Sequence, residues 1–590
     1  MAKGDYEMGS YSISDIYQGG SSLIPPNVYI KPGSLGMTTD PRSANVIKEV
    51  SEKLSSGAKQ IEIEMVSPEI FDSVPRQHFK EVNRLAKLTG VEISLHGPVI
   101  DTAGISRQGF SETSREAAER RVTDTLLRSH ELNPQGNIIV NFHTAEGIPG
   151  SQFLPPTERT KENQYKSMII INRQTGELRP LEQEEYYSPE QKDFSKPETF
   201  SPEKRLNMIN ISNWDNSINQ TIFQKEQIDK IIEESLPLIQ QYSEKIKNGQ
   251  LNPNTIGTNE QIALKHYFNA GSSLHNLDKN VRSLFDNAYQ YGDDTAKEAL
   301  KKISEQFKKI MPTEKDDFDF SKQSDAMQFL INNLKPFVPN MYDKIENFAI
   351  EKSSQTFGNA AWKSYKEFKD KSPTLVIENP PAGFALARGE DVANLVKASR
   401  NQFVENAVKE GMSNKDAEKQ AEKFIGATWD VGHINMMKKF GYTDEDIVKE
   451  SEKVAPLLKH VHLSDNFGME HTELPMGMGN VPLKEIMEKL GQKGFEAKKI
   501  IEAGNWWQHF HTSPFQESLE AMGSPIYGMK MAPYWDKAPG LYQGYFSGYG
   551  QMLPQINYET FGSGFSRLPS ELGGQVAGAG GSRMSGRPME

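Results

Sequence analysis

The sequence predicts an α/β fold in which eight parallel strands, each followed by a helix, close into a barrel. Short β-branched runs alternate along the chain with amphipathic helical patterns, which is typical of βα units around a parallel sheet. Eight such runs are present, the number that a (β/α)8 barrel requires. The 590 residues also exceed the roughly 250 that such a barrel uses. A doubly wound open sheet is the alternative fold.

The expected strands follow one another from residue 27 to residue 505. The first, Asn27 to Thr39, is the weakest, because proline and glycine interrupt it. The others are compact runs rich in Val, Ile and aromatic residues, and they occupy residues 60–66, 91–98, 137–144, 374–381, 427–433, 459–466 and 499–505.

Helical patterns separate these strands. One helix is expected over Pro41–Leu54, with Asp40 as its N-cap and Pro41 at its first position. Another is expected over Ser111–Leu132, between the third and fourth strands.

More than 200 residues lie between the fourth and fifth strands. They begin with a polar, proline-rich segment (147 to about 205), which we predict to be a loop. Long, charged helical patterns follow, at Phe223–Lys247, Asp294–Met311 and Tyr342–Lys369. We interpret residues 151–370 as a mostly helical insertion into a discontinuous barrel of residues 27–150 and 371–535. Composition does not distinguish a spacer from an assembly surface.

The two ends of the chain differ in composition from the rest. Residues 1–26 are polar with Gly and Ser and predict a flexible leader, and residues 536–590 form a Gly-rich, low-complexity tail.

The overall composition excludes several classes of function. Asp and Glu (79) outnumber Lys and Arg (67), and the net charge of -12 argues against broad, nonspecific nucleic-acid binding. The absence of cysteine excludes disulfides, thiol nucleophiles and thiolate-bound metals. No apolar run reaches the roughly 18 residues of a membrane span, and the N-terminus shows no secretory signal. We therefore expect a soluble, cytoplasmic protein without membrane partners.

Histidines and carboxylates gather at the C-terminal ends of the expected strands. They are His96, His143, Glu378, Asp430, His433, His462, Asp465 and Glu502, with His471 and Glu473 in the loop after the seventh strand. In a barrel these strand ends meet at one mouth. A single polar residue at a strand end is more often a hydrogen-bonding residue than a ligand. The joint pattern favours a divalent-metal site built from His and carboxylate ligands.

Some neighbouring residues are given structural roles only. His460 is expected in the barrel core, and Glu62 and Glu64 are expected to form hydrogen bonds inside the barrel without taking part in catalysis. Asp465 is a candidate to orient a ligand histidine.

The motifs LHGP, NFHT, IENPP, TWDVGH, HVHLSDN and IIEAG occur in this order. Their order resembles that of the xylose isomerase-like TIM-barrel superfamily and, within it, the endonuclease IV family of apurinic/apyrimidinic endonucleases. The resemblance covers about 40–150 and 371–510, and it leaves out the insertion and the tail.

The resemblance implies three metal sites, two of which share one carboxylate. The first would use His96, His143 and Glu378, the second Glu378, Asp430, His462 and Glu502, and the third His433, His471 and Glu473.

The third site departs from the family pattern, which has Asp-x-His shortly before a Gly-x-Gly turn. Here the loop is EHTELPMGMGN. Alignment on Gly477 and Gly479 places His471 at the Asp position and Glu473 at the His position, whereas alignment on EH brings Glu470 and His471 near the pattern. A His and carboxylate pair in exchanged order still offers two competent zinc ligands.

The resemblance implies a metal-dependent phosphodiester hydrolase that acts on abasic or damaged DNA, with two or three zinc ions and with Glu378 and Glu502 as catalytic residues. The cations would supply a hydroxide nucleophile and stabilise the leaving oxygen. The alternative is a sugar isomerase or epimerase of the same superfamily, with a small sugar or sugar phosphate as substrate and one Mn²⁺ or Mg²⁺ ion. A barrel that serves as a non-catalytic scaffold is the third hypothesis.

Overall fold

The computed structural model describes residues 6–8, 28–30, 35–54, 58–106, 108–144, 147–160, 163–187, 189, 194–247, 257–312, 320–504, 506, 514–515 and 517–518. The expected leader and tail lie outside these residues, except for strand β1 (Tyr6–Met8), which pairs with β2 (Val28–Ile30). The chain divides into two compact units. Unit 1 contains Met1–Gly150, Leu154–Thr157 and Ala349–Glu590, and unit 2 contains Ser151–Phe153 and Glu158–Phe348.

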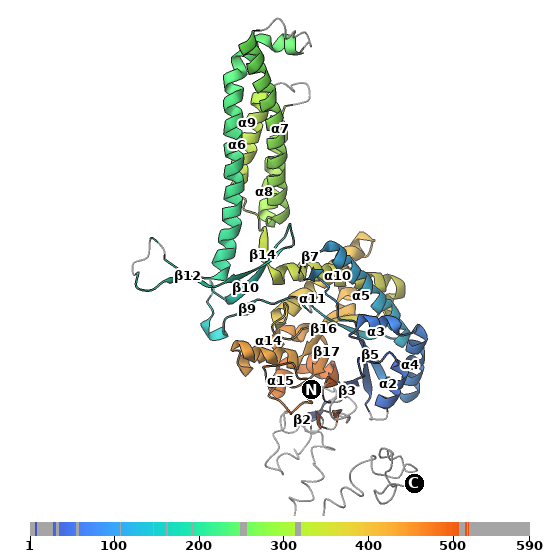
Figure 1. Cartoon of the computed structure of the whole chain (residues 1–590). Coiled ribbons are helices and arrows are strands. Elements are labelled where there is room, and N and C mark those ends of the chain that lie inside the picture. The colour runs from blue at the N-terminus through green and yellow to red at the C-terminus, as the bar shows by residue number, and fades with distance from the viewer. Residues whose placement is uncertain are drawn as a thin grey trace, which may run out of the picture. The chain divides into compact units, whose positions relative to one another are not determined.

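Unit 1 is built on a closed barrel of eight parallel strands, which confirms the predicted fold (Figure 1). In barrel order the strands are β15 (Thr374–Glu378), β16 (Ile425–Asp430), β17 (Leu458–Leu463), β18 (Lys498–Ile501), β3 (Leu35–Thr38), β4 (Gln60–Glu64), β5 (Glu92–His96) and β8 (Ile139–His143). The strands are predominantly buried, as expected for a parallel sheet covered by helices.

Helices connect the barrel strands. They are α2 (Val46–Leu54), α3 (Pro68–Ser73), α4 (Arg76–Thr89), α5 (Glu112–Ser129), α10 (Ile345–Phe368), α11 (Gly389–Lys409), α12 (Asn414–Phe424), α13 (Val431–Asn435), α14 (Asp444–Val454) and α15 (Leu483–Glu496). Short 3-10 turns occupy His130–Leu132, Lys369–Lys371, Met436–Phe440 and Ala455–Leu457, and the two-residue strands β6 (Ile105–Ser106) and β7 (Gly109–Phe110) pair with each other.

The start of α2 differs from the prediction. The helix begins at Val46 and not at Pro41, because the Asp40 carboxylate accepts hydrogen bonds from the backbone and guanidinium of Arg42 and forms a local turn. The Asn45 side chain accepts from Lys48 N at 3.3 Å and takes the capping position. Helix α5 lies within the predicted range Ser111–Leu132, and Ser111 caps it, since its side chain accepts from Ser114 N at 3.4 Å.

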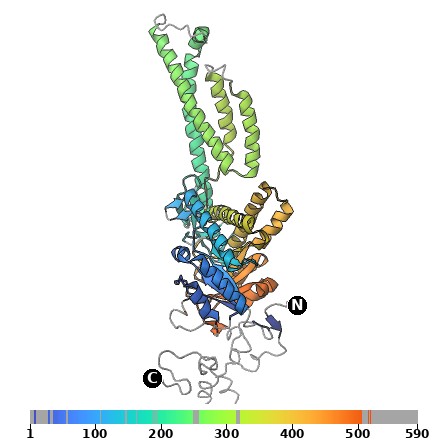
Figure 2. The ribbon, with the colours of Figure 1, turned by 90° about the vertical axis from the view of Figure 1, so that its right-hand side faces the viewer.

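Unit 2 lies between β8 and β15 in the sequence and combines a helical bundle with a small sheet. The bundle contains α6 (Pro202–Lys247), α7 (Thr258–Tyr291), α8 (Asp294–Ile310) and α9 (Phe320–Leu334), and α6 and α7 lie side by side (Figure 2). Its core includes Trp214, Leu274 and Ile331, each less than 5% exposed.

The segment that we predicted as a loop, 147 to about 205, contains strands. They are β9 (Gln152–Phe153), β10 (Tyr165–Asn172), β11 (Leu178–Glu182), β12 (Glu184–Tyr186) and β13 (Glu198–Phe200). Strand β10 pairs antiparallel with β9, β11 and β14 (Tyr342–Lys344), and β12 pairs with β13. The apolar run MIII at 168–171 supplies the buried face of β10, and the polar flanking residues concealed it.

No helix within the described ranges is long and apolar enough to cross a membrane.

Candidate metal centre

The register of the barrel strands brings the predicted ligand residues into one layer at the C-terminal mouth. Glu378 on β15 lies opposite His143 on β8, and Asp430 on β16 lies opposite His462 on β17. His96 ends β5, two strands away from β15. Residues that are far apart in the sequence thus face one another across the barrel, as the fold predicts.

Glu378 lies between two groups of side chains. Its Oε2 atom is 3.3 Å from His96 Nε2 and 3.4 Å from His143 Nε2. Its Oε1 atom is 3.0 Å from His462 Nδ1. The Asn141 amide donates to Oε2 and holds the carboxylate in this orientation. Each oxygen of one carboxylate therefore faces a different set of potential ligands.

The second group joins Glu378 to Asp430, His462 and Glu502, whose ligand atoms all lie within 4.8 Å of one another. Glu502 Oε2 is 2.9 Å from His462 Nδ1. Asp430 accepts from His433 N at 2.7 Å and from the Ser464 hydroxyl at 3.1 Å. These hydrogen bonds fix the Asp430 carboxylate at the start of α13.

The third predicted group forms a chain of contacts. His433 Nε2 is 2.7 Å from His471 Nε2, which is 3.5 Å from Glu473 Oε1. His433 Nδ1 donates to Asn379 O at 2.8 Å, which leaves the lone pair on Nε2. Burial and the nearby His471 lower the pKa of His433 to about 3, so this ring is neutral and able to bind a metal.

Glu473 is held in an unusual backbone conformation. Its φ of 43° lies in the left-handed region, a conformation that costs a non-glycine residue roughly 1–3 kcal/mol. Burial and the Glu502 carboxylate raise its pKa to about 7. Among the described residues, the groups whose ligand atoms converge within 4.8 Å do not include His433, His471 and Glu473 as a set.

The charged side chains of the first two groups shift one another's pKa. Burial alone would raise the pKa of Glu378, but His462 and His143 hold it well below its usual range. Burial would lower the pKa of His462, yet the Glu378 and Glu502 carboxylates raise it well above its usual value. Burial together with Glu502 and Glu378 raises the pKa of Asp430. Such opposed shifts are typical of functional sites.

The imidazole nitrogens and carboxylate oxygens of the centre are suited to bind a divalent cation. His96 Nδ1 donates to Gly97 O at 2.9 Å, so Nε2 and its lone pair face the Glu378 carboxylate. His96 Nε2 and Glu64 Oε2 are buried and form no hydrogen bond with the described residues. Lone pairs that face one another in a buried site require a proton or a metal cation between them. Imidazole and carboxylate together suit zinc, and also Mn²⁺ and Mg²⁺ where carboxylates dominate.

Two glutamates on β4 belong to the centre although we had assigned them no part in it. Glu62 Oε1 is 2.8 Å from His462 Nε2, and its Oε2 is 2.9 Å from His460 Nε2. Glu64 is grouped with His96 and Glu502. The i, i+2 spacing that points both glutamates into the barrel was visible in the sequence, but their partners on β17 and β5 depend on barrel closure.

Asp465 does not orient a ligand histidine as we had predicted. Its carboxylate accepts backbone N–H groups from Asn466 at 2.9 Å, Gly477 at 2.8 Å and Val481 at 3.1 Å. It therefore fixes both ends of the loop that carries the third group.

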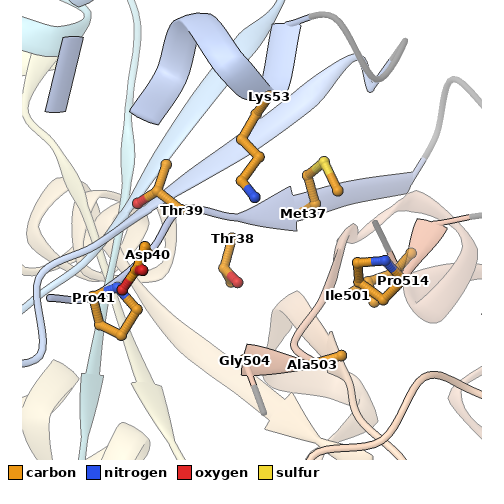
Figure 3. A pocket seen from close by; sticks show the side chains of 10 residues that line it. All are labelled: Met37, Thr38, Thr39, Asp40, Pro41, Lys53, Ile501, Ala503, Gly504 and Pro514. Atoms are coloured by element: carbon orange, nitrogen blue, oxygen red, sulfur yellow. The ribbon is translucent and has the colours of Figure 1, made fainter. Parts of the chain in front are cut away.

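A pocket opens beside the centre, at the ends of β3 and β18 (Figure 3). Its lining consists of Met37, Thr38, Thr39, Asp40, Pro41, Lys53, Ile501, Ala503, Gly504 and Pro514. The lining includes both chain neighbours of Glu502 but none of the clustered ligand residues. The Lys53 side chain with its ammonium group forms part of the pocket lining, and burial lowers the pKa of this group.

The fold and this cluster define a TIM-barrel protein with a candidate metal centre at its carboxyl mouth. The family model described as xylose isomerase-like TIM barrel matches residues 403–522. This range includes His433 and five further candidate residues of the centre: Asp430, His462, His471, Glu473 and Glu502. This part of the barrel, about a fifth of the chain, is therefore similar to the xylose isomerase-like TIM barrels.

Individual similar proteins match only a small part of the chain or share little sequence identity with it. An uncharacterized protein from Methanocaldococcus jannaschii is 31% identical over 83 residues, which are 14% of this chain and 27% of that protein. The chain thus spans about a quarter of the length of that curated relative. A D-tagatose 3-epimerase-like protein is 12% identical, with a TM-score of 0.36 over 84% of this chain and 98% of that one. D-Psicose 3-epimerase from Clostridium cellulolyticum H10 is 9% identical, with a TM-score of 0.35 over 83% and 96%.

Proposed function

We propose that the protein is a multi-metal phosphodiester hydrolase that cleaves DNA at abasic or damaged nucleotides. One observation carries the proposal: the two oxygens of Glu378 face separate sets of ligands, His96 and His143 on one side and His462 on the other. A carboxylate in this position can bridge two cations, which is the arrangement that enzymes use to act on both the attacking and the leaving oxygen of a phosphodiester.

Each of the two proposed ions would be held by its own set of residues, with Glu378 in both sets. His96, His143 and Glu378 would hold one ion, and Glu378, Asp430, His462 and Glu502 would hold the other. Bound cations supply Lewis acidity and lower the pKa of water to near neutrality. Asn141 keeps the Glu378 carboxylate between the two sets, and Ser464 keeps Asp430 in place. The proposed substrate follows from the motif resemblance.

The charge of the centre supports a requirement for cations. Five carboxyl groups, those of Glu62, Glu64, Glu378, Asp430 and Glu502, are at most 9% exposed. Without cations this cluster would repel the phosphate of any phosphodiester. With cations the same cluster would accept it, and a protein with a net charge of -12 would then be able to bind DNA at this site.

The test measures metal content and cleavage in parallel. Protein purified without chelators is analysed by plasma mass spectrometry and is then assayed on a duplex with a single abasic site. We expect two or three zinc ions in the wild-type protein and one fewer in His96→Ala and His143→Ala. Cleavage by these variants should fall by about 100-fold or more, since a cation contributes several kcal/mol to the transition state. The matched control is His78→Ala, a half-buried histidine on α4.

A second candidate function, a sugar isomerase or epimerase, has its own supporting observation. Glu378, Asp430, His462 and Glu502 could hold one ion without His96 or His143. In that case a single Mn²⁺ or Mg²⁺ ion would be found, His96→Ala and His143→Ala would retain it, and a ketose would be epimerised while abasic DNA stays intact. That result would replace the hydrolase proposal.

A further inference from the structure

We infer that Glu62 is a positioning residue of the metal centre: its carboxylate holds the Nε2 side of His462 and so directs Nδ1 of that ring toward Glu378, Asp430 and Glu502. The inference rests on the metal centre of the proposed function but not on its substrate. It adds a residue that offers no ligand atom to the two proposed ion sites.

The two ring nitrogens of His462 face different carboxylates. Glu62 Oε1 lies 2.8 Å from Nε2, while Glu378 Oε1 and Glu502 Oε2 lie 3.0 and 2.9 Å from Nδ1. Because a carboxylate only accepts, Nε2 carries the proton that it donates to Glu62. Nδ1 also faces carboxylates and carries a proton in the metal-free ring. A cation held by Glu378, Asp430 and Glu502 would displace this proton and use the Nδ1 lone pair, while Nε2 keeps its proton for Glu62.

Glu62 is itself held in place by residues on two neighbouring strands. The Ser94 hydroxyl on β5 donates to Glu62 Oε2 at 2.6 Å, and His460 Nε2 lies 2.9 Å from the same oxygen. Glu62, His460 and His462 are fully buried, at 0% exposure. The carboxylate is therefore fixed by neighbours on both β5 and β17, and it has no freedom to leave the His462 ring.

The positioning role of Glu62 differs from that of a ligand in a further ion site. Glu62, His460 and His462 could also converge on a cation of their own. However, both Glu62 oxygens already have close partners, and His462 cannot give Nε2 to such a cation while donating its proton to Glu62. A separate ion would have to displace the contact that orients His462. The arrangement matches a carboxylate–histidine–metal relay, in which the outer carboxylate fixes the tautomer and the ring orientation.

The test measures zinc affinity directly and needs no substrate. Zinc is titrated into chelator-treated full-length protein in competition with a chromophoric chelator, and Co²⁺ absorption reports the ligand geometry. Glu62→Gln has one acceptor oxygen for two histidines, so we expect zinc affinity to fall by about 10- to 100-fold with the number of ions unchanged. Ser94→Ala removes one support of Glu62 and should lower the affinity by about fivefold. Both variants should alter the Co²⁺ spectrum.

The matched control is Glu119→Gln. Glu119 is a buried carboxylate on α5 that pairs with Lys363 and Arg115, outside the metal centre. Its loss should lower stability as much as that of Glu62 but leave zinc affinity and the Co²⁺ spectrum unchanged.

The possible outcomes separate the two proposals. If the wild-type protein binds no zinc, the proposed function fails. If the wild-type protein binds zinc and both Glu62→Gln and Ser94→Ala keep its affinity, the positioning role is wrong and the proposed function stands. If Glu62→Gln lacks one whole ion, Glu62 is itself a ligand, and the inference is overturned. Should Glu62→Gln not fold, the fivefold shift of Ser94→Ala decides alone.

Discussion

At the scale of single residues, the metal centre buries several charged side chains close to one another. Glu378, Glu502 and Glu62 all contact one histidine, His462, whose side chain is fully buried. Even with a second proton on His96, which lies beside Glu378, two imidazolium rings do not neutralise three carboxylates in a medium of low dielectric constant. Bound cations would resolve the imbalance, and the histidine protons are then the species that a metal would displace.

His96 makes this displacement measurable. Burial would lower its pKa, but the Glu64 and Glu378 carboxylates raise it to about 9. At pH 7 the metal-free ring should therefore hold a proton that zinc displaces, and apparent zinc affinity should rise by about tenfold per pH unit for each such proton until pH 9. Calorimetric titration in buffers of different ionisation enthalpy counts the released protons. A release of no protons at pH 7 would contradict this assignment.

The same pKa predicts how pH affects stability after chelation. The pKa of His96 is raised from 6.5 to about 9, so its stabilising effect is complete below about pH 6.5 and is lost as pH rises through 9. Glu502 has a pKa lowered from 4.5 to about 2, and its contribution is complete above pH 4.5 and lost only as pH falls through 2. The melting temperature of chelator-treated protein should thus fall between pH 7 and pH 9.5. Zinc-loaded protein, with His96 deprotonated at both pH values, should show a smaller fall.

At the scale of elements, the loop after β17 should depend on one carboxylate. Asp465 accepts three backbone N–H groups and also pairs through its backbone with Leu474. Asp465→Ala leaves these buried groups unpaired and should release His471 and Glu473 from their positions. If the loop helps to hold a third ion, the variant should lose that ion and keep those held around Glu378.

Plasma mass spectrometry of the variant checks the expectation, and Asp391→Ala provides the control. Asp391 is a buried carboxylate on α11 that pairs with Arg388, the residue just before that helix. Equal metal content in wild-type protein and Asp465→Ala would mean that the loop holds no ion.

The elements also show what the sequence could and could not predict. The strand ends that carry His96, Glu378 and His462 were predictable, because alternating βα patterns and the convergence of barrel strands are local and topological regularities. The contact of Glu62 with His462 was not predictable, because His462 lies 400 positions away on β17 and the contact depends on the strand order of the closed barrel. The start of α2 was missed since Asp40 binds Arg42, a competition between turn and cap that residue type alone does not decide.

At the scale of the whole molecule, the two units have separate cores and the chain enters and leaves unit 2 at neighbouring points. Ser151 N donates to the Glu346 carboxylate at 3.0 Å, and Ile170 on β10 pairs with Lys344 on β14. All of the clustered ligand residues belong to unit 1. An element with its own core and adjacent ends can be removed without opening the remaining fold.

We therefore predict that replacing residues 152–345 with a short Gly/Ser linker leaves a folded barrel with the same number of zinc ions per chain as the full-length protein. Plasma mass spectrometry and circular dichroism check this. Loss of metal from a folded barrel would show that unit 2 supports the centre. If the shortened protein keeps its zinc but cleaves abasic duplex more slowly while still hydrolysing a small phosphodiester at the wild-type rate, the insertion serves duplex binding and the barrel alone carries the chemistry. Equal loss on both substrates would instead assign unit 2 a part in the reaction itself.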